Sequence, residues 1–256
     1  MSDVLSTYLA RNKDILLLKS KNNTVIAGPE YCYFKRLLKE ELIKYYQLIF
    51  PEILFVELSL PGVVSTTDLE SFGYTKDFQI VSLEAPGKSL KPELFAGSYN
   101  ELSSLKHYFG EKVCYYSIGS SFRNEKSTKQ RVIRSFEFEQ LELQFCVNVN
   151  FSAVFNGFFD FLSTFSHNSL RLVKEIKKDS ELPFYSEATH DINYTSKDGV
   201  TTLELGGISK RRGNITELSL GVSRVFITSM IDSDINPTIA STKLKILNTK
   251  FTRKLK

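Results

Sequence analysis

Two segments of the sequence combine charged, aromatic and amide side chains at a spacing that suits ligand binding. The segment SFRNE (121–125) is followed, after a polar stretch, by EFEQLELQF (137–145). Alternate side chains share a face in an extended chain, so one face of the second segment carries Phe138, Gln140, Glu142 and Gln144. The other face is Leu and Phe, which predicts a core-facing side, while the polar face suits the floor of a pocket. The alternative is an amphipathic hairpin with a solvated outer face.

The loop between these two segments is basic. It carries Lys126, Lys129, Arg131 and Arg134. Ammonium and guanidinium groups bind phosphates, the guanidinium with two parallel hydrogen bonds. The two segments and their loop therefore suggest a polar pocket open to a phosphate-bearing ligand.

Two further segments place glycine beside charged residues. In LELGGISKRRG (203–213) the paired glycines would let a ligand approach the backbone between Glu204 and Arg211. The alternative reading of this segment is a bulge and a turn. In ELSLGVSR (217–224) the pattern predicts a strand, a glycine turn and the start of a helix. An arginine in that place, Arg224, can lie over a flat ring or reach a phosphate.

Helical and strand patterns mark the elements that must position these residues. Apolar residues recur at helical spacing from Phe34 to Ile49, bounded by Gly28-Pro29 and Pro51, and a second helix is predicted over 154–177. Strands are predicted over 54–58, 113–117, 136–147 and 200–208. Several of them alternate in polarity, which favours an antiparallel sheet with two unlike faces.

Composition sets the class of protein. The 256 residues are 42% hydrophobic and 24% charged, which is typical of a soluble globular protein of one large or two small domains. The formal net charge of +4 is compatible with a polyanionic partner but does not demand one. The three cysteines and three histidines are scattered, which argues against a zinc site. No membrane span or secretory leader is recognised, so we expect a cytoplasmic location, with an organellar one left open.

Taken in order and spacing, these segments resemble motifs 2 and 3 of the class II aminoacyl-tRNA synthetases. The similarity is to the dimeric, α2-type glycyl-tRNA synthetase: FRNE with EFEQLELQF looks like its motif 2, and ELSLGVSR like its motif 3. The helix after Gly28-Pro29 looks like motif 1. SFGYTKDF (71–78) resembles the family's SGHxxxF segment, and LKPELFAG (90–97) its LRPETAQG segment. The resemblance covers residues 9–231 and is most specific in motif 2.

The resemblance implies an α+β fold, a class II synthetase-like antiparallel sheet of six or seven strands flanked by helices. It implies an aminoacyl-tRNA ligase that uses ATP and Mg²⁺ to activate glycine as glycyl-adenylate and transfers glycine to tRNA. A homodimer formed through residues 28–60 is also implied. The catalytic domain would span residues 1–236, and 237–256 would be a short basic tail, the remnant of a linker to an absent anticodon-binding domain.

The family's site residues map onto residues of this chain. Arg123 would hold the α-phosphate and the glycine carboxylate, Phe138 would stack under adenine, and Arg224 would cover the ring and touch the γ-phosphate. The expected catalytic residues are Arg123, Glu125 and Arg224. The expected ATP-binding residues are Arg123, Glu125, Arg134, Phe138, Glu204 and Arg224, with Glu204 also expected near Mg²⁺. The expected glycine-binding residues are Glu93, Glu142, Arg211, Glu217 and Ser219.

Some positions depart from the family pattern. Tyr74 stands where the family has histidine, Lys91 and Phe136 where it has arginine, and Leu218 where it has proline. Because the resemblance leads us to expect a catalytic core that lacks the anticodon-binding domain, two alternative functions stay open. One is glycine adenylation with transfer to a carrier protein or a small molecule. The other is a non-catalytic nucleic-acid-binding paralogue, such as an accessory subunit of a DNA polymerase.

Overall fold

A seven-stranded sheet forms the centre of the molecule. The computed structural model describes residues 17–19, 25–27, 29–74, 80–123, 136–165, 171–183, 185–195, 199, 202–211 and 215–233. The strand order is β3-β7-β8-β12-β11-β10-β9. These strands are β3 (Leu54–Glu57), β7 (Val113–Phe122), β8 (Glu137–Phe145), β9 (Leu172–Ile176), β10 (Ser186–Thr195), β11 (Thr202–Arg211) and β12 (Ile215–Gly221). Neighbours pair antiparallel, except that β3 at the edge runs parallel to β7. The expected α+β fold with a large sheet is confirmed.

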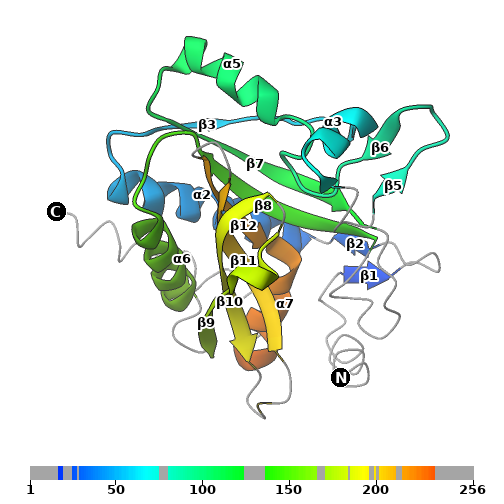
Figure 1. Cartoon of the computed structure of the whole chain (residues 1–256). Coiled ribbons are helices and arrows are strands. Elements are labelled where there is room, and N and C mark those ends of the chain that lie inside the picture. Colours follow the sequence, from blue (N-terminus) through cyan, green and yellow to red (C-terminus); the bar gives the residue numbers. More distant parts are fainter. Residues whose placement is uncertain are drawn as a thin grey trace.

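Three helices cover one face of this sheet: α2 (Pro29–Ile49), α6 (Phe151–Phe165) and α7 (Val222–Ser233), as Figure 1 shows. The main core lies between these helices and the apolar face of the strands. On β8 that face consists of Leu141, Leu143 and Phe145, each 0% exposed. The alternation predicted for this strand is therefore real, and it turns the polar residues of β8 to the opposite face.

A second, smaller layer lies over β7. It consists of α3 (Thr66–Ser71), α5 (Tyr99–Phe109) and a three-stranded sheet of β4 (Val63–Ser65), β6 (Lys88–Leu90) and β5 (Val81–Ser82). Its core contains Leu69, Tyr74, Phe95 and Tyr99, which pack with Tyr115 of β7. Tyr115 pairs with Gln144 in the sheet, so this layer stands on the polar face. It therefore walls one end of the region where the polar side chains gather.

The helix predicted over 154–177 is wrong in its second half. The helix α6 ends at Phe165, residues 166–170 lie outside the described part of the chain, and Leu172–Ile176 form the edge strand β9. β9 pairs antiparallel with β10 from His190 to Tyr194. Leu172 packs on the main core, while Val173 and Ile176 are exposed. Leu172 and Ile176 are four residues apart, a spacing that is also typical of one face of a helix, and this led to the wrong prediction. Ladder hydrogen bonds to β10 outweigh the local helical pattern.

The other predicted elements agree with the structure to within a few residues at their ends. The helix from Phe34 to Ile49 begins earlier, at Pro29, and the strand predicted at 113–117 extends to Phe122. The strand β10 was not predicted. A two-stranded antiparallel pair, β1 (Leu17–Lys19) and β2 (Val25–Ala27), precedes α2. The tail at 237–256 lies outside the described residues, so the proposed domain division stays a prediction.

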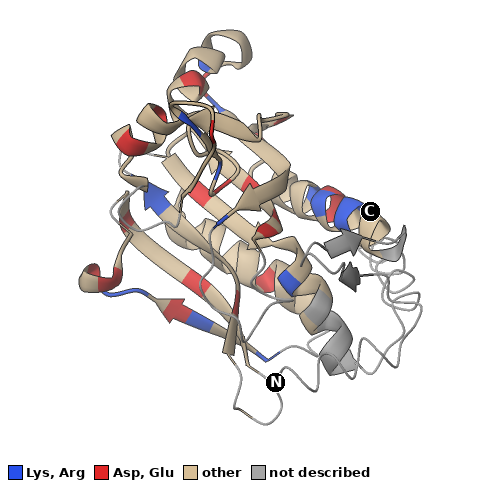
Figure 2. Ribbon diagram, turned by 90° about the vertical axis from the view of Figure 1, so that its right-hand side faces the viewer, with Lys and Arg blue, Asp and Glu red and all other residues tan. Residues whose placement is uncertain are grey.

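Basic and acidic residues both occur on the described ribbon: α2 carries Lys, Arg and Glu, and acidic residues are also present on strands of the sheet (Figure 2). Within the described ranges, no helix combines the length and the apolar character that a bilayer crossing requires.

The main core provides the first testable prediction. Phe158 on α6 is 0% exposed, and we expect Phe158→Ala to lower the free energy of unfolding by about 3–5 kcal/mol because it leaves a cavity. Phe136, which is 49% exposed, is the matched control, and its replacement by Ala should cost less than about 1 kcal/mol. Urea titrations followed by circular dichroism measure both values. Equal losses for the two variants would contradict the placement of the core.

Candidate active site

Strand pairing brings polar residues into rows on one face of the sheet. One row runs across four strands, with Asp191 opposite Gly207, Gly207 opposite Ser219, and Ser219 opposite Glu142. Directly paired residues of an antiparallel sheet point to the same side. Because glycine has no side chain, Gly207 leaves a gap between Asp191 and Ser219. The polar face predicted from β8 alone is thus continued by β12, β11 and β10.

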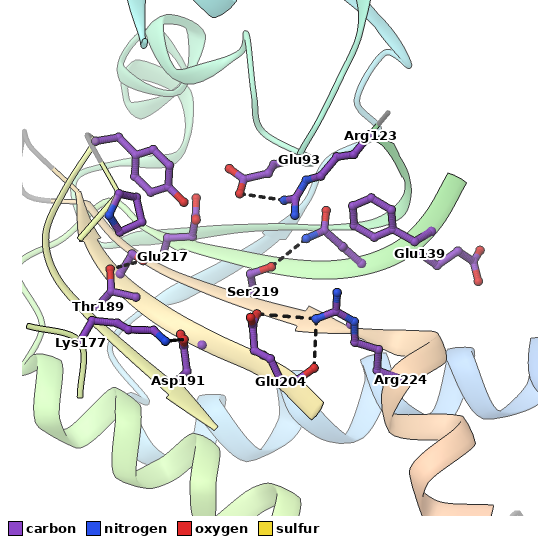
Figure 3. Close-up of a pocket in the computed structure, with 18 of the residues that line it drawn as sticks. Glu93, Arg123, Glu139, Lys177, Thr189, Asp191, Glu204, Glu217, Ser219 and Arg224 are labelled. Carbon is purple, nitrogen blue, oxygen red and sulfur yellow. Dashed lines mark hydrogen bonds and ion pairs between the residues drawn. The ribbon is translucent and has the colours of Figure 1, made fainter. Parts of the chain in front are cut away.

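A pocket of about 300 Å³ lies over this face. Figure 3 shows side chains from several strands pointing into it. Its lining includes Glu93, Arg123, Phe138, Gln140, Lys177, Tyr185, Asp191, Glu204, Gly206, Gly207, Glu217, Ser219 and Arg224. The volume suits a small organic ligand.

A buried arginine joins two acidic residues at one end of the pocket. Arg211 donates from Nε to Glu217 Oε2 at 2.7 Å and from a terminal nitrogen to Glu93 Oε2 at 3.0 Å. Its side chain is 5% exposed, and those of Glu217 and Glu93 are 4% and 8% exposed. Charges removed from water to this extent require close partners. Arg211 therefore fixes both carboxylates that line the pocket.

Aromatic rings surround this arginine. Its guanidinium carbon lies 4.0 Å from the ring centre of Tyr185 and 4.4 Å from that of Tyr99. Tyr74 stacks on Tyr185, with ring centres 5.8 Å apart. These contacts stabilise a desolvated guanidinium. They also leave Arg211 few other conformations.

The two carboxylates differ in their electrostatics. Burial and the charge of Glu217 raise the pKa of Glu93, although Arg211 and Arg123 oppose this. Burial acts on Glu217 in the same direction, but Arg211 outweighs it and holds the pKa of Glu217 below its ordinary value. Glu217 is therefore ionised across the neutral range, while Glu93 is the carboxylate more readily protonated on acidification.

The other end of the pocket carries an arginine over a phenyl ring. The Arg123 guanidinium carbon lies 5.0 Å from the ring centre of Phe138. Arg123 also donates to the carbonyl oxygen of Pro92 at 3.1 Å and to Glu93 Oε1 at 3.2 Å. Its side chain is 22% exposed, so it contacts both the acidic end and the open part of the pocket.

Arg224, at the start of α7, enters the pocket from the opposite side. It donates to the backbone carbonyl of Glu204 at 3.0 Å, and the two side chains are 3.8 Å apart. Gln140 donates from Nε2 to Ser219 Oγ at 3.1 Å, and its buried Oε1 has no hydrogen-bond partner among the described residues. Gln140 lines the pocket, and this oxygen is a buried acceptor beside it.

Two glycines of β11 lie where the structure leaves no room for a side chain. A Cβ at Gly206 would lie 2.3 Å from the backbone oxygen of Ser219, and one at Gly207 would lie 2.5 Å from Asp191 Oδ1. Both positions line the pocket. The close neighbours of these glycines are atoms of β12 and β10, and the approach of a ligand to their backbone stays a prediction.

Asp191 extends the acidic lining on the side of β10. It pairs with Lys177 at 3.2 Å. Burial and the charge of Glu204 raise its pKa to about 6, against the opposing effect of Lys177. Neither Asp191 nor Lys177 was singled out from the sequence, because their meeting depends on the pairing of β9 with β10.

The structure brings most of the predicted site residues together. Those that line the pocket are Glu93, Arg123, Phe138, Glu204, Glu217, Ser219 and Arg224. Glu125 and Arg134 lie outside the described residues, as does the basic loop. Their roles stay predictions.

Two predicted glycine-binding residues lie behind the pocket lining. Glu142 is 0% exposed and accepts hydrogen bonds from the backbone N–H groups of Leu94 at 3.1 Å and Phe95 at 3.2 Å. Burial raises its pKa well above the ordinary value. Arg211 contacts Glu93 and Glu217 instead of the open cavity. Both residues therefore position other residues of the site. Arg211 fixes the carboxylates of Glu93 and Glu217, and Glu142 holds the backbone next to Glu93.

Of the expected magnesium site, the described residues include the carboxylate of Glu204 but no complete set of metal ligands. Glu204 lines the pocket with its side chain 53% exposed, and Asp191 lies on the same side. Within the described ranges, no group of three or more His, Cys, Asp and Glu residues is arranged to hold a metal ion. Mg²⁺ usually binds through one or two carboxylates together with substrate phosphates, so Glu204 fits it as a partner to a bound triphosphate.

Solved structures of other proteins share the arrangement of helices and strands found in this chain. A prolyl-tRNA synthetase from Giardia lamblia in complex with prolyl-adenylate matches with a TM-score of 0.72, at 14% identity, over 90% of this chain and 53% of that chain. A prolyl-tRNA synthetase from Cryptosporidium parvum complexed with halofuginone and AMPPNP matches with a TM-score of 0.70 at 12% identity. The match covers 89% of this chain and 51% of that chain. This chain has the class II aminoacyl-tRNA synthetase fold.

Sequence comparison agrees with the class II fold. The chain is 31% identical to a glycine–tRNA ligase from Clostridium beijerinckii over 159 residues, which are 59% of this chain and 34% of that protein. It is 28% identical to a glycine–tRNA ligase from Staphylococcus saprophyticus over 202 residues, 75% of this chain and 40% of that protein. The chain thus spans well under half the length of these curated relatives, and no family model matches it. The expected resemblance to a class II synthetase catalytic core is confirmed.

Replacement of Arg211 tests whether its charge stabilises the buried carboxylates of Glu93 and Glu217 in the folded state. We expect Arg211→Met to lower the free energy of unfolding by about 3–5 kcal/mol at pH 8, because two buried carboxylates lose their shared cation. Without that cation, burial and repulsion raise the pKa of both carboxyls above their unfolded values. Stability is then lost as the pH rises, and the deficit should be smaller at pH 5 than at pH 8.

The control for this variant is Lys210→Met in the same strand, since Lys210 forms only an exposed pair with Glu187 at 3.5 Å. Urea titrations of both variants at the two pH values provide the measurement. A deficit in Arg211→Met that is equal at pH 5 and pH 8 would show that the arginine does not neutralise the carboxylates.

Proposed function

We propose that this protein activates glycine with ATP, forming glycyl-adenylate and pyrophosphate, and then transfers glycine to tRNA. The observation that carries the proposal is the fixed carboxylate pair, Glu93 and Glu217, beside an arginine that also faces a phenyl ring. The first group suits an α-ammonium and the second suits a carboxylate next to a nucleotide. The class II fold and the sequence similarity to glycine–tRNA ligases support the same reaction.

Charge balance favours an ammonium group at the acidic end. Glu93 and Glu217 share one buried cation, Arg211, and Arg123 reaches the pair through the Oε1 atom of Glu93. When Arg123 turns toward a substrate carboxylate or phosphate, one negative charge remains unbalanced in a region of low dielectric. A substrate ammonium restores neutrality.

The walls around the acidic end favour a small amino acid. Tyr185 and Ser219 line the pocket here, and Tyr74, Tyr99 and Arg211 pack behind the carboxylates. These side chains are held by hydrogen bonds and ring contacts, so they cannot move aside for a larger substrate at low cost. Glycine, which has no side chain, fits this arrangement best.

The opposite end suits the nucleotide. Phe138 offers a ring face on which adenine can stack, with Arg224 covering the adenine from the far side. When bound with the triphosphate, Mg²⁺ held by Glu204 would spread the charge of the phosphates. The carboxylate oxygen of glycine attacks the α-phosphorus, a new O–P bond forms, and the bond to the bridging oxygen breaks to release pyrophosphate. Arg123 binds the charge that develops on the α-phosphate.

Transfer to tRNA, a homodimer and a cytoplasmic location are parts of the same proposal. The exposed apolar residues Leu48, Ile49 and Leu54 lie within residues 28–60, which supports a dimer contact there. A carrier protein or a small amine would use the same first half-reaction. A nucleic-acid-binding paralogue would not need the complete pocket described above.

Glycine-dependent exchange of pyrophosphate into ATP tests the first half-reaction. We expect the purified protein to catalyse this exchange with glycine and to show less than about a hundredth of that rate with alanine or serine. Exchange with none of the amino acids would contradict amino-acid activation. If exchange occurs, the transfer of labelled glycine to total tRNA then decides whether tRNA is the acceptor.

The role of Arg123 is tested by Arg123→Ala. We expect exchange to fall by at least about a hundredfold, because the charge on the α-phosphate loses its partner. The thermal midpoint should stay within a few degrees of that of the unmodified protein, since the side chain is partly exposed. Arg36→Ala, an exposed arginine on α2, is the control for the loss of a guanidinium. Retained exchange in Arg123→Ala would contradict the assigned role.

A further inference from the structure

Two tyrosine hydroxyls reach the carboxylate pair from outside the main sheet. Tyr74 follows α3 and is 0% exposed, and Tyr99 is the first residue of α5 and is 6% exposed. Both belong to the smaller core over β7. Neither was assigned a role from its sequence position.

Each hydroxyl binds one carboxylate. Tyr74 donates to Glu93 Oε2 at 2.8 Å and accepts from Arg211 at 2.9 Å. Tyr99 donates to Glu217 Oε2 at 2.8 Å. The two hydroxyl oxygens are 3.3 Å apart, so they link the acidic residues to each other as well as to the smaller core.

These bonds divide the carboxylate oxygens into two classes. Glu217 Oε2 accepts from Tyr99, from Arg211 and from Gln144, and Glu93 Oε2 accepts from Tyr74 and Arg211. Among the described residues, each Oε1 has one hydrogen-bond partner, Arg211 at 3.0 Å for Glu217 and Arg123 at 3.2 Å for Glu93. Each Oε1 therefore carries fewer hydrogen bonds than the corresponding Oε2, which leaves both Oε1 atoms with capacity to accept from an ammonium.

We propose that Tyr74 and Tyr99 are positioning residues for the amino-acid substrate, which hold Glu93 and Glu217 ionised and oriented so that their Oε1 atoms bind the α-ammonium group. The inference rests on the proposed function. It deepens that function by assigning the positioning of the ammonium-binding carboxylates to hydroxyls on a separate layer of the fold. The smaller layer is thereby part of the binding site and not only a cover for β7.

The physical reason is that two nearby carboxylates resist simultaneous ionisation in a buried site. The charged or titratable groups that face the pair from the surrounding elements are Arg123, Arg211, Glu142, Tyr74, Tyr99 and Tyr185. The hydrogen bond from Tyr74 lowers the pKa of Glu93, and the one from Tyr99 lowers the pKa of Glu217. Removal of a hydroxyl should therefore raise the pH at which the pair takes up a proton.

Replacement by phenylalanine isolates the hydroxyls. The ring of Tyr99 also packs on Arg211 and on Phe72, with a ring-centre distance of 5.1 Å to the latter, and Phe preserves that packing. The variants are Tyr74→Phe, Tyr99→Phe and the double variant. Tyr108→Phe is the matched control, because Tyr108 is on the same helix as Tyr99 and is 82% exposed.

The experiment measures KM for glycine and for ATP in pyrophosphate exchange from pH 6 to pH 9, and glycine affinity by calorimetry at the same pH values. We expect each single variant to raise KM for glycine by about tenfold or more, with a smaller change in kcat and an unchanged KM for ATP. We also expect the acidic limb of the profile of kcat/KM for glycine to move to higher pH. Tyr108→Phe should match the unmodified protein.

Several outcomes overturn the inference. If the unmodified protein is active and the variants keep its KM for glycine and its acidic limb, the hydroxyls do not position the carboxylates, while the proposed function stands. If KM for glycine and KM for ATP rise together with a lowered thermal midpoint, the hydroxyls have a structural role only. If the unmodified protein neither exchanges pyrophosphate nor binds glycine, both proposals fail.

Discussion

The buried ion pairs of Arg211 are the constraint on which the candidate site depends. One guanidinium is shared by Glu93 and Glu217, and all three groups are almost fully removed from water. Such a cluster is costly to bury unless each charge has close partners, and here hydrogen bonds from Tyr74, Tyr99 and Gln144 complete it. The strands β11 and β12 and the smaller layer must therefore keep their relative positions for the cluster to exist.

The architecture satisfies this constraint by separating two faces of one sheet. Helices α2, α6 and α7 cover the apolar face, so that the main core forms without the polar residues. The polar face is left for the pocket, and the smaller layer closes it at β7, where Glu93 and the two tyrosines enter. Gly206 and Gly207 let β11 lie close to β12 and β10 under the pocket. Arg224 then provides a cation at the open part of the pocket, and Arg123 provides one between that part and the acidic end.

Alternation and motif order predicted much of this arrangement. The two faces of β8, the strand–glycine–helix pattern ending at Arg224, and the pocket positions of Glu93 and Glu217 follow from local sequence or from the family resemblance. Contacts between distant segments were not predictable in the same way. The bond between Tyr99 and Glu217 joins residues 118 positions apart, and the Lys177–Asp191 pair exists only because 172–176 is a strand and not the end of a helix. Periodicity over five residues does not distinguish these two states when edge pairing decides between them.

The central claim is that the carboxylate pair recognises an ammonium group. The most direct measurement is calorimetric titration of the unmodified protein, in the presence of a non-hydrolysable ATP analogue, with glycine and with glycolate. Glycolate keeps the carboxylate and the size of glycine but has a hydroxyl in place of the ammonium. The account predicts that glycine binds at least about a hundredfold more tightly, because only the ammonium balances the charge of Glu93 and Glu217. Equal affinity for the two ligands would contradict it.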